Sequence, residues 1–124
     1  MFVTYTKIVT LKTMRQEEFN KCCQDLHDLR RAEQNAKQAA YTHHSEDVLA
    51  NFKIISITAG MTPLQVLNVY KAKHDIALST YINTQLEAEP VETRIADLMN
   101  YLELAYALIC EIKAAQTNWV CRPC

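Results

Sequence analysis

The stretch EPVETRIADLMNYLELAYALI, residues 89–109, decides the fold more than any other part of the chain. Its apolar residues recur every three or four positions, which is the spacing of one face of an α-helix. Pro90 marks the start, because proline is well tolerated in the first turn of a helix. This is the most apolar helical segment of the sequence. We therefore expect it to be the central helix of a bundle, with the other helices packed around it.

Three further segments show the same helical spacing and carry start or stop signals. Thr13 and Ser45 are candidate N-caps for the first two, because a hydroxyl oxygen can accept a hydrogen bond from the first turn. The third begins at Thr62-Pro63, a cap followed by a proline at the first helical position. Gly60 suits the left-handed backbone that ends the second helix. The predicted ranges are about 14–40, 46–58 and 63–82, with the fourth helix opening at Pro90.

The composition agrees with an all-α domain. The 124 residues suffice for one domain, and one glycine with three prolines leaves few of the tight turns that sandwiches and barrels need. We divide the chain into an extended arm (1–12), a helical domain (13–116) and a C-terminal tail (117–124). The arm alternates in the manner of a strand but has no partner strand, so it pairs across a dimer, packs as an arm, or is disordered.

The balance of charges argues against nucleic acid and membranes as partners. Thirteen basic and fourteen acidic residues are mixed along the chain and give a net charge of −1, so no cationic face is prepared for a phosphate backbone. No apolar run approaches the roughly 18 to 20 residues that span a bilayer, and the N-terminus lacks the apolar stretch of a signal peptide. The expected compartment is the cytoplasm.

Two short motifs raise the question of a metal. Cys121 and Cys124 form a C-R-P-C sequence, which is half a zinc site or a redox pair. His43 and His44 are adjacent in a predicted loop without a third ligand. A structural zinc has four ligands, so neither motif predicts a metal site.

Polar side chains at helix positions near the expected core are the candidate site residues. Six of them lie in or near the first two turns of the fourth helix: Glu89, Glu92, Arg94, Asp97, Asn100 and Tyr101. A second group at the end of the first helix consists of Lys37, Tyr41, His43 and His44, and the third helix carries Lys71, Lys73 and His74. Antiparallel packing would gather several of them at one end of the bundle, where they would hold an anion or a metal-bound nucleotide. The structural alternative is a surface ion pair of Arg94 and Asp97, worth about 0–1 kcal/mol.

The runs YTHHSEDVLANFK (41–53), MTPLQVLNVYKAKH (61–74) and EPVETRIADLMNYLELAYALI (89–109) resemble small phage and prophage proteins related to the nucleotide-modification-associated domains. The likeness covers roughly residues 15–113. It implies an all-α accessory protein connected with nucleotide metabolism or DNA-base modification. It also implies a pocket lined by Lys37, Tyr41, Asn51, Lys73, Glu89, Arg94, Asp97, Asn100 and Tyr101.

Three functions follow as alternatives. The first is binding of a nucleotide or nucleotide-derived ligand in a polar pocket between helices. The second is a phage-encoded interaction protein that inhibits a host defence system through a surface. The third is a Mg²⁺-dependent nucleotide pyrophosphohydrolase, since Asp25 with Asp28 and Glu89 with Glu92 are carboxylate pairs of the kind that hold Mg²⁺. We favour a protein without catalytic activity, and a homodimer because of the arm and the apolar fourth helix.

Overall fold

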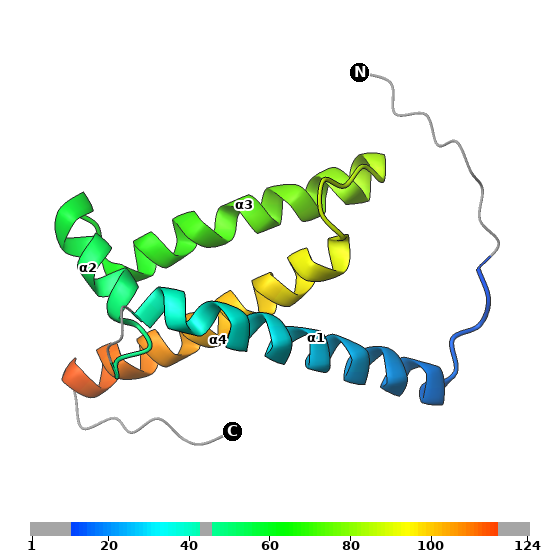
Figure 1. Cartoon of the computed structure of the whole chain (residues 1–124), viewed down its shortest axis with the longest axis horizontal. Helices are drawn as coiled ribbons and strands as arrows, with labels where there is room; N and C mark the ends of the chain where they lie inside the picture. The colour runs from blue at the N-terminus through cyan, green and yellow to red at the C-terminus, as the bar shows by residue number, and fades with distance from the viewer. Residues whose placement is uncertain (1–10, 43–45, 117–124) are drawn as a thin grey trace.

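Four α-helices account for most of the chain in the computed structural model, which describes residues 11–42 and 46–116 and, for 38–42, the backbone alone (Figure 1). They are α1 (Gln16–Thr42), α2 (Ala50–Ala59), α3 (Pro63–Thr84) and α4 (Val91–Gln116). The described ranges contain no strand, and none of their helices is long and apolar enough to cross a membrane. The all-α prediction is confirmed. The predicted strand-like arm and the tail fall almost wholly outside these ranges.

The helix limits differ most from expectation at α2, which begins at Ala50 instead of residue 46. Asp47 explains the difference, because its Oδ1 accepts a hydrogen bond from the backbone N–H of Leu49 at 2.9 Å. This bond stabilises a turn before the helix and so delays its start. Pro90 lies just outside α4, and its carbonyl accepts the N–H of Thr93 at 3.0 Å.

The junction between α2 and α3 is built as the sequence predicts. Gly60 ends α2 with φ of 67°, in the left-handed region that glycine adopts without a steric penalty. Thr62 then starts α3 with a complete capping box: its hydroxyl accepts from the N–H of Gln65 at 3.2 Å, and the Gln65 side chain accepts from the N–H of Thr62 at 2.9 Å. Pro63 occupies the first helical turn. Local signals therefore fix this sharp change of direction.

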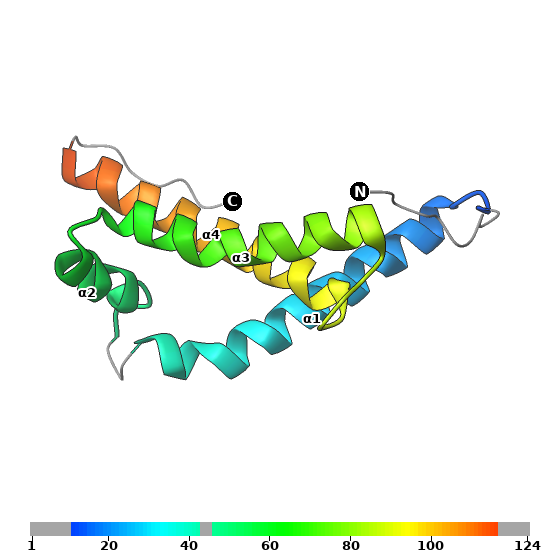
Figure 2. The same ribbon diagram turned by 90° about the horizontal axis from the view of Figure 1, so that it is seen from above.

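The long helices α3 and α4 run side by side in opposite directions, and α1 crosses α4 (Figure 1, Figure 2). α4 contacts both of them but does not pack on α2, so the predicted central place of this helix holds for two of its three neighbours. α2 packs instead against α3 and α1, and Lys53 of α2 reaches Glu111 of α4 through a side-chain contact of 2.7 Å. The apolar core lies near this end of the bundle and consists of Leu49, Phe52, Val66, Leu67, Tyr101 and Leu108.

Removing the capping hydroxyl of Thr62 should destabilise the fold. We expect Thr62→Ala to lower the free energy of unfolding by about 1 kcal/mol, because the backbone N–H of Gln65 loses its acceptor. Thr58→Ala is the matched control, since the Thr58 hydroxyl only bonds back to the Ile54 carbonyl within α2. Urea denaturation of both variants measures the difference. Equal midpoints would show that the cap contributes nothing.

Candidate functional site

Asp97 of α4 is a buried carboxylate at which three helices meet. Its Oδ1 lies 2.8 Å from Nζ of Lys37 on α1, and its Oδ2 lies 3.6 Å from Nδ1 of His74 on α3. The side chains of Asp97 and His74 are only 7% and 5% exposed. A buried carboxylate is costly unless it is paired. The ion pair with Lys37 therefore ties α1 to the α3–α4 pair.

Arg94 fixes the protonation state of His74. The guanidinium Nη1 lies 3.2 Å from Nδ1 of His74, and a guanidinium can only donate. The ring nitrogen must accept, so we assign a neutral imidazole with its proton on Nε2. The pKa of His74 agrees: burial lowers it below 6.5, and the positive charges of Lys73, Arg94 and Lys37 act in the same direction, against the opposite effect of Asp97.

Lys37 stays charged in this environment. Burial alone would lower its pKa, but the hydrogen bonds to Asp97 and to Glu33 dominate together and raise the pKa above 10.5. Glu33 lies one helical turn away on α1, with its carboxylate 3.2 Å from Nζ. The ammonium group is thus held by two carboxylates and has little capacity left for an outside anion.

Asn100 and Tyr101 serve the packing of α4 against its neighbours. Asn100 donates from Nδ2 to the carbonyl of Arg30 on α1 at 3.2 Å. Tyr101 is buried in the apolar core, and its ring centroid lies 5.5 Å from that of His74. These contacts connect the core with the charged group around Asp97.

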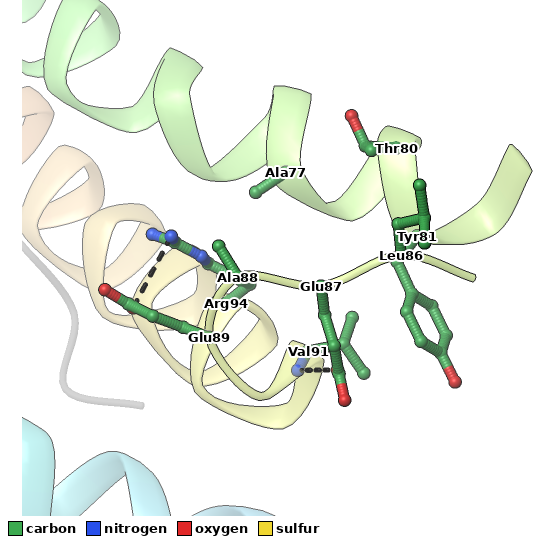
Figure 3. A pocket seen from close by; sticks show the side chains of 9 residues that line it. All are labelled: Ala77, Thr80, Tyr81, Leu86, Glu87, Ala88, Glu89, Val91 and Arg94. Atoms are coloured by element: carbon green, nitrogen blue, oxygen red, sulfur yellow. Dashed lines mark hydrogen bonds and ion pairs between the residues drawn. The ribbon is translucent and has the colours of Figure 1, made fainter. Parts of the chain in front are cut away.

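A hollow opens on the other side of Arg94, between α3 and the segment that leads into α4 (Figure 3). It has a volume of about 130 Å³ and is lined by Ala77, Thr80, Tyr81, Leu86, Glu87, Ala88, Glu89, Val91 and Arg94. Figure 3 shows Arg94 and Glu89 on one side and Tyr81 with Leu86 on the other. The hollow therefore has a charged side and an apolar side.

One ion pair and one hydrogen bond define the charged side of the hollow. Nη2 of Arg94 lies 3.4 Å from Glu89, while Glu87 accepts the N–H of Val91 at 2.8 Å and so caps the start of α4. Arg94 is 18% exposed in its side chain, and Glu89 is 61% exposed. Arg94 is the only cation of the lining. It joins the hollow to the buried charges through His74.

The structure divides the predicted site residues into separate groups. Lys37, Asp97, Asn100 and Tyr101 lie in the buried contacts between helices, whereas Glu89 and Arg94 line the hollow. Lys73 is exposed on α3 and Asn51 is half-buried on α2, and neither lines the hollow. The side chain of Tyr41 is outside the described part of the chain.

The single pocket expected for all nine residues is thus not formed, because the ion pairs of Lys37 and Asp97 close the space between α1 and α4. Arg94 with Asp97 is not the expected surface pair either, since Asp97 is buried.

His74 was one of the polar residues expected to converge but was left out of the predicted pocket, and the apolar lining of the hollow was not predicted. His74 sits at a position of the apolar repeat of α3, and a titratable residue at such a position is the signal that could have identified it. Ala77, Tyr81 and Leu86 gave no signal, because they are ordinary residues of a helix and a loop. Only the packing of α3 on the start of α4 brings them together.

The acidic pairs considered for Mg²⁺ do not assemble. Within the described ranges no group of three or more His, Cys, Asp or Glu residues could hold a metal ion. Asp25 pairs with Lys21 at 3.3 Å, and Asp28 accepts a hydrogen bond from Gln24 at 2.9 Å on exposed α1. Any Mg²⁺ would therefore need most of its ligands from a bound phosphate group or water.

Neutralising Asp97 should destabilise the protein. Asp97→Asn leaves Lys37 and His74 facing an amide, and we expect the free energy of unfolding to fall by about 1–3 kcal/mol. Asp75→Asn is the matched control: Asp75 pairs with Lys71 on the exposed face of α3, where such pairs contribute at most about 0.5 kcal/mol. Chemical denaturation at pH 7 measures both. Similar losses in the two variants would contradict a special role for Asp97.

The lowered pKa of His74 predicts a pH dependence of stability. The unfolded chain takes up a proton on His74 as the pH falls below about 6.5, whereas the folded chain does so only at lower pH. The free energy of unfolding must therefore decrease as the pH falls through this window, by at most about 1.4 kcal/mol per pH unit. Denaturation between pH 7.5 and 5.5 should show a smaller decrease for His74→Gln than for the wild type. His27→Gln, on exposed α1, controls for loss of a histidine. If the free energy of unfolding of His74→Gln fell with pH as steeply as that of the wild type, the lowered pKa of His74 would be refuted.

The chain matches no family model, and comparison with curated proteins and with solved structures finds nothing similar. The resemblance to nucleotide-modification-associated proteins stays a prediction.

Proposed function

We propose that this protein binds a nucleotide or nucleotide-derived ligand in the hollow between α3 and the start of α4, as an accessory protein of a phage or prophage. The observation that carries the proposal is the position of Arg94. Its guanidinium borders the hollow and is held from behind by His74 at 3.2 Å. An oriented guanidinium presents its donors in fixed directions, which favours recognition of planar acceptors and of phosphate.

The size and the apolar wall suit a nucleobase. The volume of about 130 Å³ lies below the 300–1,000 Å³ that is usual for small-molecule sites, so the hollow takes up only part of a nucleotide. Tyr81, Leu86 and Val91 supply apolar surface against which a planar base can pack. Thr80 and Arg94 supply hydrogen-bonding groups. The base or nucleoside part of the ligand therefore belongs in the hollow.

The carboxylates of Glu87 and Glu89 decide which end of the ligand enters. A bare triphosphate next to two carboxylates would be repelled. Carboxylates accept hydrogen bonds from amino groups of a base or from ribose hydroxyls. A Mg²⁺ ion brought by the phosphates would also relieve the repulsion. We therefore propose binding and no catalytic step.

A second candidate is an interaction protein that antagonises a host defence system, and the outer face of α2 favours it. Ile54 and Ile57 lie three residues apart on α2 and are 51% and 84% exposed, and the exposed Met61 follows in the turn after Gly60. This apolar face lies at the end of the molecule opposite to the hollow (Figure 1). It would serve a protein partner and not a nucleotide.

Thermal-shift and calorimetric titrations test the first proposal with adenosine, guanosine, cytidine, thymidine and their 5′-mono- and triphosphates, each with and without Mg²⁺. A ligand at 100 times its Kd adds about 2.7 kcal/mol to the free energy of unfolding and raises Tm. We expect Arg94→Ala to weaken the binding by about 10- to 100-fold, because a hydrogen bond to a charged group is lost.

Two further variants separate binding from stability. Ala77→Phe fills the hollow without changing its charge and should abolish binding. Arg31→Ala removes an exposed arginine that bonds only to Gln34 on α1 and should bind normally. If no compound shifts Tm, or if Ala77→Phe binds as well as the wild type, the hollow is not the site. The α2 face would then be examined with Ile57→Asp in partner pull-downs.

A further inference from the structure

The N-terminal part of α1 extends beyond the bundle without a cover. Every residue from 16 to 25 is exposed, and this part of the helix projects past the start of α4 (Figure 1, Figure 2). Its polar side chains are paired among themselves, Gln16 with Asn20 at 2.8 Å and Lys21 with Asp25 at 3.3 Å. Its apolar face consists of Phe19, Cys22 and Cys23, which are exposed, and of Leu26, which is half-buried. We call these four residues the α1 stripe.

A second uncovered stripe runs along α4. Leu102, Tyr106 and Ile109 are 56%, 47% and 37% exposed and share one face of the helix. We call these three residues the α4 stripe. They lie in the half of α4 that is away from the projecting part of α1 (Figure 1). The two stripes of one molecule therefore cannot cover each other.

The two stripes match in spacing and length. Phe19, Cys23 and Leu26 are separated by four and three residues, and so are Leu102, Tyr106 and Ile109. Each stripe therefore spans about 10 Å at 1.5 Å per residue. Equal spacing lets the side chains of one helix pack between those of another.

We propose that both stripes are covered by a second copy of this chain. The α1 stripe of each copy packs on the α4 stripe of the other, so that a two-fold axis creates two identical contacts. Such an arrangement closes on itself and leaves neither stripe exposed. The projecting N-terminal part of α1 would then form part of the dimer interface.

The area of the two stripes comes close to the area that a specific dimer buries. A half-exposed large apolar side chain leaves roughly 100 Å² to be covered. The stripes contain four such residues, Phe19, Leu102, Tyr106 and Ile109, which bring on the order of 400 Å² per copy and about 800 Å² in both copies. The exposed Cys22 and Cys23 and the polar atoms beside the stripes add to this area and bring it toward the roughly 1,000 Å² expected of a specific interface.

The exposed apolar residues of α3 are a poorer match. Val69 and Ile76 share a face, but Lys73 lies between them and is exposed. Packing the α1 stripe there would bury an ammonium group without a partner. The α4 stripe has no charged residue within it.

Sedimentation equilibrium of the full chain in reductant tests the proposal, with the reductant preventing cross-links through Cys22 and Cys23. We expect the mass of two chains. Phe19→Glu and Leu102→Glu should each raise the dimer dissociation constant by at least about 100-fold, because each places a carboxylate in both apolar contacts. Ile57→Glu, on α2 outside both stripes, should dimerise like the wild type. Circular dichroism confirms that each variant is folded.

Mixing the two variants shows whether the α1 stripe of one copy packs on the α4 stripe of the other. In a mixed dimer of Phe19→Glu and Leu102→Glu, both carboxylates fall in one contact and the other contact is intact. The mixture should therefore associate more strongly than either variant alone. If α1 paired with α1 and α4 with α4, the mixture would recover nothing. A monomeric wild type, unaffected variants, or no recovery on mixing would each overturn the proposal.

Discussion

The buried carboxylate of Asp97 is the constraint on which the arrangement of the helices depends. It is held by Lys37 from α1 at 2.8 Å and lies near His74 of α3, so it can be buried only when all three helices are in place. Apolar packing tolerates small shifts between helices, whereas an unpaired buried charge costs several kcal/mol. The charge pair therefore selects one relative position of α1 on the α3–α4 pair. The apolar core around Phe52 and Leu67 supplies the stabilisation.

α4 contributes side chains to three regions of the molecule: the apolar core, the buried charges around Asp97 and the hollow. Toward its C-terminal end the helix contributes Tyr101 and Leu108 to the core, and at its start it contributes Arg94 to the hollow. His74 contacts Arg94 and stacks near Tyr101, so it connects the three regions. A ligand that changed the position of Arg94 would remove the donor from His74. Because a neutral His74 needs that donor, the hollow and the buried charges are coupled.

The bundle leaves much apolar surface uncovered for a protein of this size. The described residues include large hydrophobic side chains that are exposed on every helix, and none of the large side chains is completely buried. Soluble monomers rarely expose contiguous apolar patches. The two matched stripes of α1 and α4 and the smaller face of α2 thus point to contacts with other chains, which the small core alone does not provide.

The sequence by itself determined the helices, because the signals that make them are local. Periodic apolar residues, the capping box of Thr62 and the left-handed Gly60 act within a few residues, and all four helices occur where the sequence predicts them, with limits shifted by a few residues. Only the tertiary structure decided which polar groups meet. Lys37 and Asp97 are 60 residues apart in sequence, and their contact depends on the angle at which α1 crosses α4. That angle is set by side-chain packing over the whole interface, and no short motif encodes it. Because the sequence does not encode this angle, it predicted one pocket where the structure has the buried ion pair of Lys37 and Asp97 and a separate hollow beside Arg94.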